Sequence, residues 1–135
     1  MMMARPESVL PGSEVEPPLF TKGYDLVTWL IQETLRFPHL YRGTLVARLH
    51  DAGIALLVHL QAARFAGARR ASALSLADVE LDTLRVLLRL AKDLRVLSIK
   101  KYLSGAERLR EIGKMIGGWK KPTVKKPTGS EVMDA

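Results

Sequence analysis

Apolar residues recur with the period of an α-helix through most of this chain of 135 residues. From about residue 19 to residue 118 they return every three or four positions, whereas no segment alternates apolar and polar residues for long enough to predict a β-strand. The pattern is interrupted at Phe37-Pro38, around Gly67 and at Ser98. The sequence therefore predicts an all-α fold built from four helices.

The four predicted helices have the lengths and short connections of an up-and-down antiparallel four-helix bundle. We place them at residues 19–36, 42–65, 72 or 75 to 97, and 98–116. Ser72 or Ser75 should cap the third helix, and Asp78 would then compensate the positive end of its dipole. We expect Ser98 to cap or separate the fourth helix and Gly117-Gly118 to end it.

The third helix has more apolar surface than one bundle core can bury. Its apolar side chains span roughly 220°, whereas packing on one side needs an arc of little more than about 100°. The excess predicts a second buried surface and therefore self-association. We assign Val79, Val86, Leu90 and Leu97 to a subunit interface. Trp29 of the first helix falls among charged residues, and we favour a subunit contact for it over base stacking.

The chain has the length of one domain with one hydrophobic core. We place the bundle at residues 19–118, between a disordered N-terminal tail (1–18) and a basic, flexible C-terminal tail (119–135). The most apolar stretch, residues 52–63, is shorter than the ~20 residues of a membrane-spanning helix, and the N-terminus has no apolar signal segment. The absence of cysteine excludes disulfides and fits a reducing compartment. We therefore expect a cytoplasmic protein that does not associate with membranes.

Residues suited to catalysis are few and scattered. His50 and His59 share a predicted helix, but nine residues separate them, so they face opposite sides and could not share a metal. Asp78 and Asp82 lie one turn apart and could bind a cation or act as an acid–base pair; compensation of the helix dipole is the alternative. No glycine-rich phosphate loop follows a strand. The sequence predicts no catalytic site, metal or cofactor.

The predicted bundle is basic, with sixteen Lys and Arg against nine acids in residues 19–118 and a net charge of +7 for the whole chain. Such a charge favours polyanionic partners. The cations form three groups: Arg85, Arg89 and Lys92 along the third helix, Arg69-Arg70 in the loop before it, and Lys120-Lys121 with Lys125-Lys126 after the last helix. Each group could neutralise phosphates of RNA and DNA, without a motif for reading bases. The alternatives are a solvated helix face and a solubilising tail.

Four segments occur in order at the spacing of a helical bundle: LFTKGYDL at residues 19–26, Phe37-Pro38, LRVLLRLAKDL at 84–94 and IGKMIGGW at 112–119. Together they resemble the accessory variability determinant (Avd) proteins of diversity-generating retroelements, over about residues 18–121. The wider relatives are four-helix-bundle proteins encoded in intervening sequences of bacterial ribosomal RNA genes.

The resemblance implies a homopentamer of four-helix bundles that forms a basic barrel. It also implies association with the element's reverse transcriptase and template RNA during mutagenic retrohoming, in which adenine-directed errors are copied into a variable gene. The family's role in contacting polyanions carries over onto Arg85, Arg89 and Lys92, whereas Arg69, Arg70 and the lysines after Trp119 lie at or beyond the margins of the match. Two functions remain open: a non-catalytic, nucleic-acid-binding accessory subunit of a reverse transcriptase, or a self-assembling helical scaffold whose partner is another protein.

Overall fold

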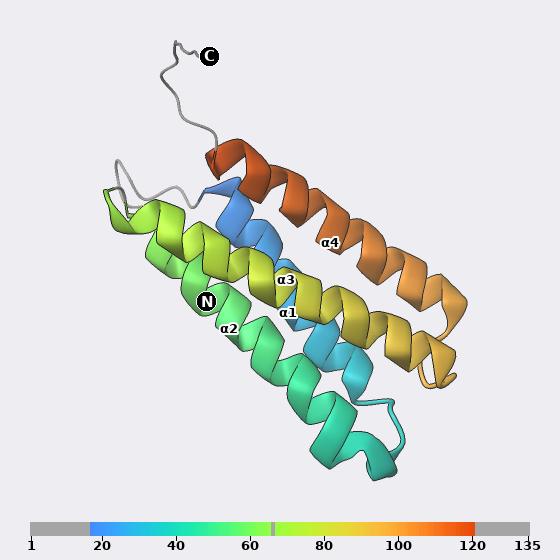
Figure 1. The fold of residues 1–135 in the computed structure, drawn as a ribbon. Coiled ribbons are helices and arrows are strands. Elements are labelled where there is room, and N and C mark those ends of the chain that lie inside the picture. The colour runs from blue at the N-terminus through green and yellow to red at the C-terminus, as the bar shows by residue number, and fades with distance from the viewer. Residues whose placement is uncertain (1–16, 66, 121–135) are drawn as a thin grey trace, which may run out of the picture.

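The computed structural model describes residues 17–65 and 67–120 and folds them into four α-helices of an up-and-down antiparallel bundle (Figure 1). The helices are α1 (Pro18–Thr34), α2 (Ala47–Ala63), α3 (Arg69–Asp93) and α4 (Ile99–Lys120). Each helix packs against two neighbours in the order α1–α2–α3–α4, and α1 closes the ring against α4. No strand occurs in either described range, and the predicted all-α class and four-helix packing are confirmed.

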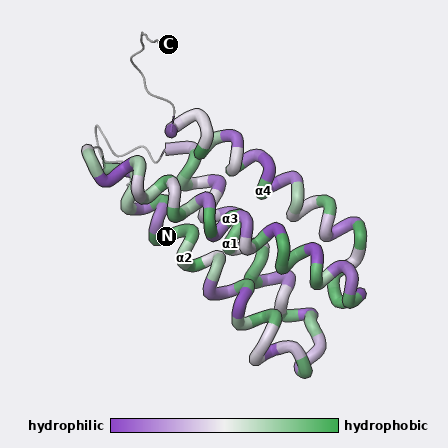
Figure 2. Tube along the Cα trace, in the orientation of Figure 1, coloured by the Kyte–Doolittle hydropathy of each residue, from purple (hydrophilic) through white to green (hydrophobic). Residues whose placement is uncertain are grey.

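The core is made from one leucine-rich stripe of each helix, and Figure 2 shows hydrophobic positions recurring along all four. Its largest fully buried side chains include Leu26, Leu30, Leu49, Leu56, Leu81, Leu88, Leu109 and Ile112. Burying one such side chain stabilises the folded state by roughly 1.5–3 kcal/mol relative to leaving it exposed. The helical periodicity of the sequence thus corresponds to a single shared core.

Two short helices, η2 (His39–Tyr41) and η3 (Arg42–Val46), join α1 to α2. The second is a π-helical turn that runs directly into α2. The α-helix α1 ends at Thr34, two residues before the predicted end, because the last turn tightens ahead of Pro38: the Phe37 amide donates to the Thr34 carbonyl oxygen at 3.1 Å.

The start of α3 differs from the prediction. The helix begins at Arg69, before Ser72 and Ser75, and no side chain caps it. The preceding Gly67 has a φ of 116°, which lets the chain turn sharply enough for the helix to begin two residues later. The predicted serine caps are therefore wrong, and Arg69 and Arg70 lie in the first turn of α3 rather than in a loop.

The helix α3 ends earlier than predicted, so the connection to α4 is longer than expected. The helix α3 ends at Asp93, and the chain then turns Leu97 into the core, where only 4% of it is exposed. The assignment of Leu97 to a subunit interface is therefore wrong, because a helical wheel extended past Asp93 no longer describes its direction. The Ser98 cap is confirmed, since its hydroxyl oxygen accepts from the Lys101 amide at 3.1 Å.

The end of α4 also differs from the prediction, because the helix passes through Gly117-Gly118 and reaches Lys120. Two contacts hold its last turn against α3: the Arg70 guanidinium lies 4.9 Å from the centre of the Trp119 ring, and Lys120 Nζ lies 2.9 Å from Asp78 Oδ2. They offset the helix penalty of glycine, about 1 kcal/mol per residue. Asp78 pairs with α4 in the interior of α3, so its predicted role at the helix dipole is wrong.

The polar face of α1 is covered by α4 within the same chain. Trp29 is half-buried there: a Cβ on Gly105 would lie 2.8 Å from its ring, and the Arg108 guanidinium lies 5.3 Å from the ring centre. Two ion pairs flank this contact, Lys22–Glu111 at 3.3 Å and Lys101–Glu33 at 2.9 Å. The charged neighbours of Trp29 in sequence thus mark a polar helix–helix contact within the chain, and an additional contact of Trp29 with another subunit stays a prediction.

The side of α3 that faces away from the core is apolar. Val79, Val86 and Leu90 remain 58%, 66% and 44% exposed, and Leu76 and Leu94 are exposed beside them. We call these five residues the outer face of α3. At about 1.5 Å per residue this face is roughly 27 Å long. The excess apolar surface predicted for the third helix is confirmed, and its burial by another subunit stays a prediction.

Candidate nucleic-acid interface

The charges of the described residues are distributed unevenly along the bundle axis. The antiparallel topology brings residues 17–22, 61–65, 67–71 and 114–120 to one end, the terminal end, and residues 33–46 and 92–101 to the other, the loop end (Figure 1). The terminal end has six Lys and Arg and no acid, and the loop end has six Lys and Arg and two acids, or +6 and +4. The remaining residues form a waist with five cations and seven acids, or −2. Two of these acids, Asp78 and Glu111, pair across the boundary with Lys120 and Lys22 of the terminal end. Both ends are therefore basic.

The predicted row on the third helix lies along the side of α3 that faces α4. Arg85 bonds to Asp82, and its guanidinium reaches α4 where Gly113 leaves space: a Cβ there would lie 2.6 Å from Arg85 Nη2. Arg85 is thus held between a carboxylate and the neighbouring helix.

The other two cations of the row share one carboxylate. Asp93 lies 3.9 Å from Arg89 Nε and 3.4 Å from Lys92 Nζ, and Lys92 also lies over the Tyr102 ring at 4.7 Å. With Asp82 and Asp93 counted, the row has a net charge of +1 rather than +3. Because exposed ion pairs contribute only about 0–1 kcal/mol, a phosphate could still compete for these cations, but the row is a weaker polyanion site than its sequence indicates.

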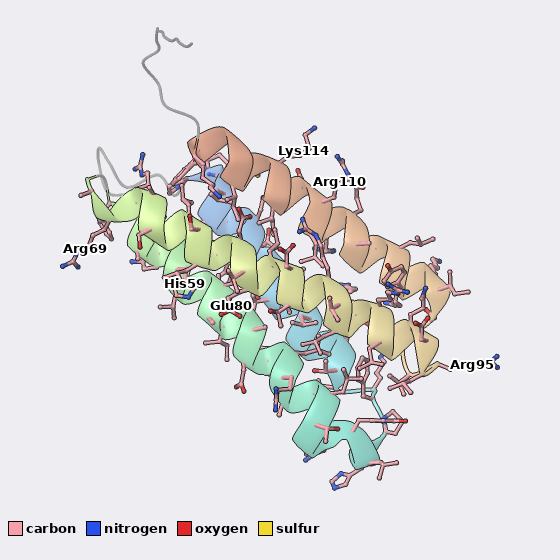
Figure 3. All side chains as sticks on the ribbon, viewed as in Figure 1. His59, Arg69, Glu80, Arg95, Arg110 and Lys114 are labelled. Carbon is pink, nitrogen blue, oxygen red and sulfur yellow. The ribbon has the colours of Figure 1, made fainter. Side chains whose placement is uncertain are left out.

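On the waist, Arg110 is also paired with an acid. Arg110 donates to both carboxylate oxygens of Glu107, at 3.0 and 2.7 Å. These hydrogen bonds hold the pKa of Glu107 below its usual value, so its negative charge persists and offsets that of Arg110. Figure 3 shows Arg110 and Lys114 pointing outward from α4.

At the terminal end, the predicted pair Arg69-Arg70 divides into two roles. Arg70 donates from Nε to the Ala63 carbonyl oxygen at 3.0 Å and from Nη2 to the Arg64 carbonyl oxygen at 3.4 Å, while its face covers Trp119. It therefore joins the end of α2 to α3 and α4. Arg69 is exposed and points away from the bundle (Figure 3), so it is the member of the pair that is open to a ligand.

Two further features of the terminal end bear on binding. Lys120 pairs with Asp78, whereas Lys121, Lys125 and Lys126 lie outside the described residues. Phe65, which the sequence analysis did not single out, is 64% exposed next to Arg64. An exposed aromatic ring among cations is a typical stacking platform for unpaired bases.

Besides Lys101, which pairs with Glu33, the loop end contains four cations that the sequence analysis missed: Arg36, Arg42, Arg95 and Lys100. All four are exposed, and none makes an ion pair or side-chain hydrogen bond within residues 17–65 and 67–120. They were missed because they come singly from two distant connections rather than as a run on one helix. The topology was the available signal, since residues that flank alternate breaks of an antiparallel bundle meet at one end.

The described histidines and acids do not assemble into a metal site. His50 Nε2 lies 2.8 Å from Thr34 Oγ1, whose hydrogen bonds to the Ile31 carbonyl oxygen, so the histidine donates to the threonine. Within the described residues, no group of three or more His, Asp or Glu side chains could hold a metal ion. Nor does any helix among them have the length and apolar character to cross a membrane.

Comparison with known proteins adds the family. No match was found among curated proteins. Residues 19–123 match the model of the bAvd-like family, the bacterial Avd-like proteins, and this range contains all four helices of the bundle. The match begins within one residue of α1 and extends past the end of α4, and it covers most of the chain, so this protein belongs to the bAvd-like family.

Proposed function

We propose that this protein is a non-catalytic accessory subunit of a retroelement reverse transcriptase, and that it binds RNA and DNA during mutagenic retrohoming in a diversity-generating retroelement. Membership of the bAvd-like family supports the association with such an element. The observation that carries the nucleic-acid role is the separation of charge, +6 and +4 at the two ends of the bundle against −2 at the waist. Clustered cations bind phosphates through release of counterions.

The protein acts as a homo-oligomer in this proposal, and a pentamer is preferred because of the family. The exposed Val79, Val86 and Leu90 on the outer face of α3 support self-association, because monomeric proteins rarely expose an apolar stripe of such length. A second copy that covers this face would remove its apolar surface from water.

Assembly through the waist would leave both basic ends of every subunit free. Bundles packed side by side would then repeat the cations of the terminal end around one rim and those of the loop end around the other. Several weak phosphate contacts would combine through effective concentration, so affinity would exceed what one subunit provides. Binding would depend on phosphates more than on base sequence.

The test is a salt titration of the purified protein with single-stranded RNA and with DNA. We expect affinity for both, and a plot of log affinity against log salt with a slope of about 0.7–0.9 for each phosphate neutralised. Co-purification with the reverse transcriptase encoded beside its gene would confirm the partner. Absence of binding at low salt would contradict the proposal.

That negative result would favour the second function, a self-assembling helical scaffold with a protein partner. The apolar outer face of α3 is the observation that favours it, since this face fits protein association whether or not nucleic acid binds. A reverse transcriptase gene next to the gene of this protein would favour the accessory role, and its absence would favour the scaffold.

A further inference from the structure

Arg95 has an unusual backbone conformation for a residue of its type. Its φ is 65°, in the left-handed region, and among the described residues no other non-glycine residue has a positive φ. It follows the end of α3 in a Schellman turn: the Val96 amide donates to the Ala91 carbonyl oxygen at 3.0 Å, and the Arg95 amide donates to that of Lys92 at 2.9 Å. Glycine usually occupies this position, because a Cβ is unfavourable there.

The side chain of Arg95 does not contribute to the fold of the described residues. It is exposed, it points away from the end of the bundle (Figure 3), and it makes no hydrogen bond, ion pair or ring contact within residues 17–65 and 67–120. The two hydrogen bonds of the turn use backbone atoms alone. Glycine would therefore make the same turn with less strain, and no contact with the described residues explains the arginine.

The surroundings of Arg95 suit an anion. It lines an open cavity of about 530 Å³ together with Lys92, Ser98 and the apolar Leu97 and Ile99. Asp93 lines the same cavity, but its carboxylate already lies near the Arg89 and Lys92 side chains. A guanidinium can donate two parallel hydrogen bonds to a phosphate, and it stays charged at any pH that the fold would survive.

We infer that Arg95 binds a phosphate of the nucleic-acid backbone, with Lys92 as the second cation, and that this contact offsets a strained turn. Strained conformations of this kind occur where function requires a particular side chain. The inference rests on the proposed function and deepens it, because it selects the α3–α4 connection at the loop end as a contact point with RNA.

The test is Arg95→Gly, measured by thermal unfolding and by affinity for a single-stranded RNA of about 20 nucleotides. Relief of the strain should raise the Tm by about 2–5 °C. Loss of the cation should lower the affinity about fivefold or more at ~0.1 M salt and flatten the salt dependence. A variant that is more stable and binds less well separates a binding role from a structural one.

Two variants complete the test. Arg95→Lys keeps the charge and the strain, so its Tm should stay at the wild-type value and most of its affinity should remain. Arg48→Gln removes one exposed cation from α2 at the waist and is the matched control for net charge; it should weaken binding less than Arg95→Gly does.

Wild-type affinity in Arg95→Gly, or an equal loss in Arg48→Gln, would overturn the inference and leave the proposed function intact. A lower Tm in Arg95→Gly would also overturn it, because the arginine would then stabilise the fold. Failure of the wild-type protein to bind RNA is a different outcome, and it would contradict the proposed function itself.

Discussion

The waist and each end of this bundle hold similar numbers of cations, five against six, and differ in how many acids lie beside them. At the waist, Arg85 and Arg110 are each bonded to a carboxylate on their own helix, and acids outnumber cations. At the ends, Arg36, Arg69 and Arg95 are exposed without a carboxylate partner among the described residues. The waist also carries Leu76, Val79, Val86 and Leu90 of the outer face of α3, whose fifth residue, Leu94, lies at the loop end. The difference supports our proposal that the waist serves assembly and that the ends serve polyanion binding.

The largest expected effect comes from Leu90→Glu on the outer face of α3. If a second subunit covers this face, the variant buries an unpaired charge, which costs several kcal/mol, so the assembly should dissociate. Light scattering measures the change. Leu103→Glu, on an exposed apolar position of α4 outside the outer face of α3, is the control and should leave the assembly intact. A wild-type protein that is a monodisperse monomer of about 15 kDa at micromolar concentration would contradict the assignment of this face to assembly.

Next in size is the removal of the loop-end cations. Replacing Arg36, Arg42, Arg95 and Lys100 together by glutamine should lower RNA affinity on the order of a hundredfold at ~0.1 M salt, since four phosphate contacts are lost.

The matched control has the same net charge but loses its cations from the waist. It replaces Arg48, Arg85, Arg89 and Arg110 by glutamine, and we expect a loss of less than about tenfold, because three of these four pair with acids. Equal losses in the two variants would mean that net charge alone, rather than its position, determines binding.

A smaller effect is expected for the row on α3. Replacing Arg85, Arg89 and Lys92 by alanine should weaken RNA and DNA binding alike, by roughly threefold to tenfold. The slope of log affinity against log salt should decrease by less than the amount expected for three phosphates. Helicity and oligomer size should not change. Unaltered affinity and slope would remove this row from the interface, while a loss as large as that of the loop-end variant would restore it as the main site.

The smallest effect has the opposite sign. Asp93→Asn removes the acid that Arg89 and Lys92 share, so both cations become more available, and RNA affinity should rise about twofold to fivefold. The same salt titration measures it. Asp25→Asn, an exposed acid on α1, provides the control for net charge, and a rise of the same size there would show that the position of Asp93 is unimportant.

The helical period predicted the class of fold, the four helices and the leucine stripes, because these depend on residues three and four positions apart in one segment. It also predicted the second apolar face of α3, since Val79, Val86 and Leu90 share a direction on any regular helix through them. Helix ends were less predictable. The pairing of Lys120 with Asp78 and the stacking of Arg70 on Trp119 carry α4 past two glycines, and both contacts join residues about 40 or more positions apart.

The sequence by itself therefore determined an all-α chain with a core and a spare apolar face, and a positive total charge. Only the tertiary structure decided which cations gather at one end of the bundle. Asp82 and Asp93 lie within four residues of the cations that they pair with, so the spacing of a single helix accounts for these pairs. Arg36, Arg42, Arg95 and Lys100 come from two connections and meet at the loop end only in the folded bundle, where cations outnumber acids. The physical reason is that apolar periodicity is local, whereas the field of a charge depends on every charge within about 10 Å, whichever helix it comes from.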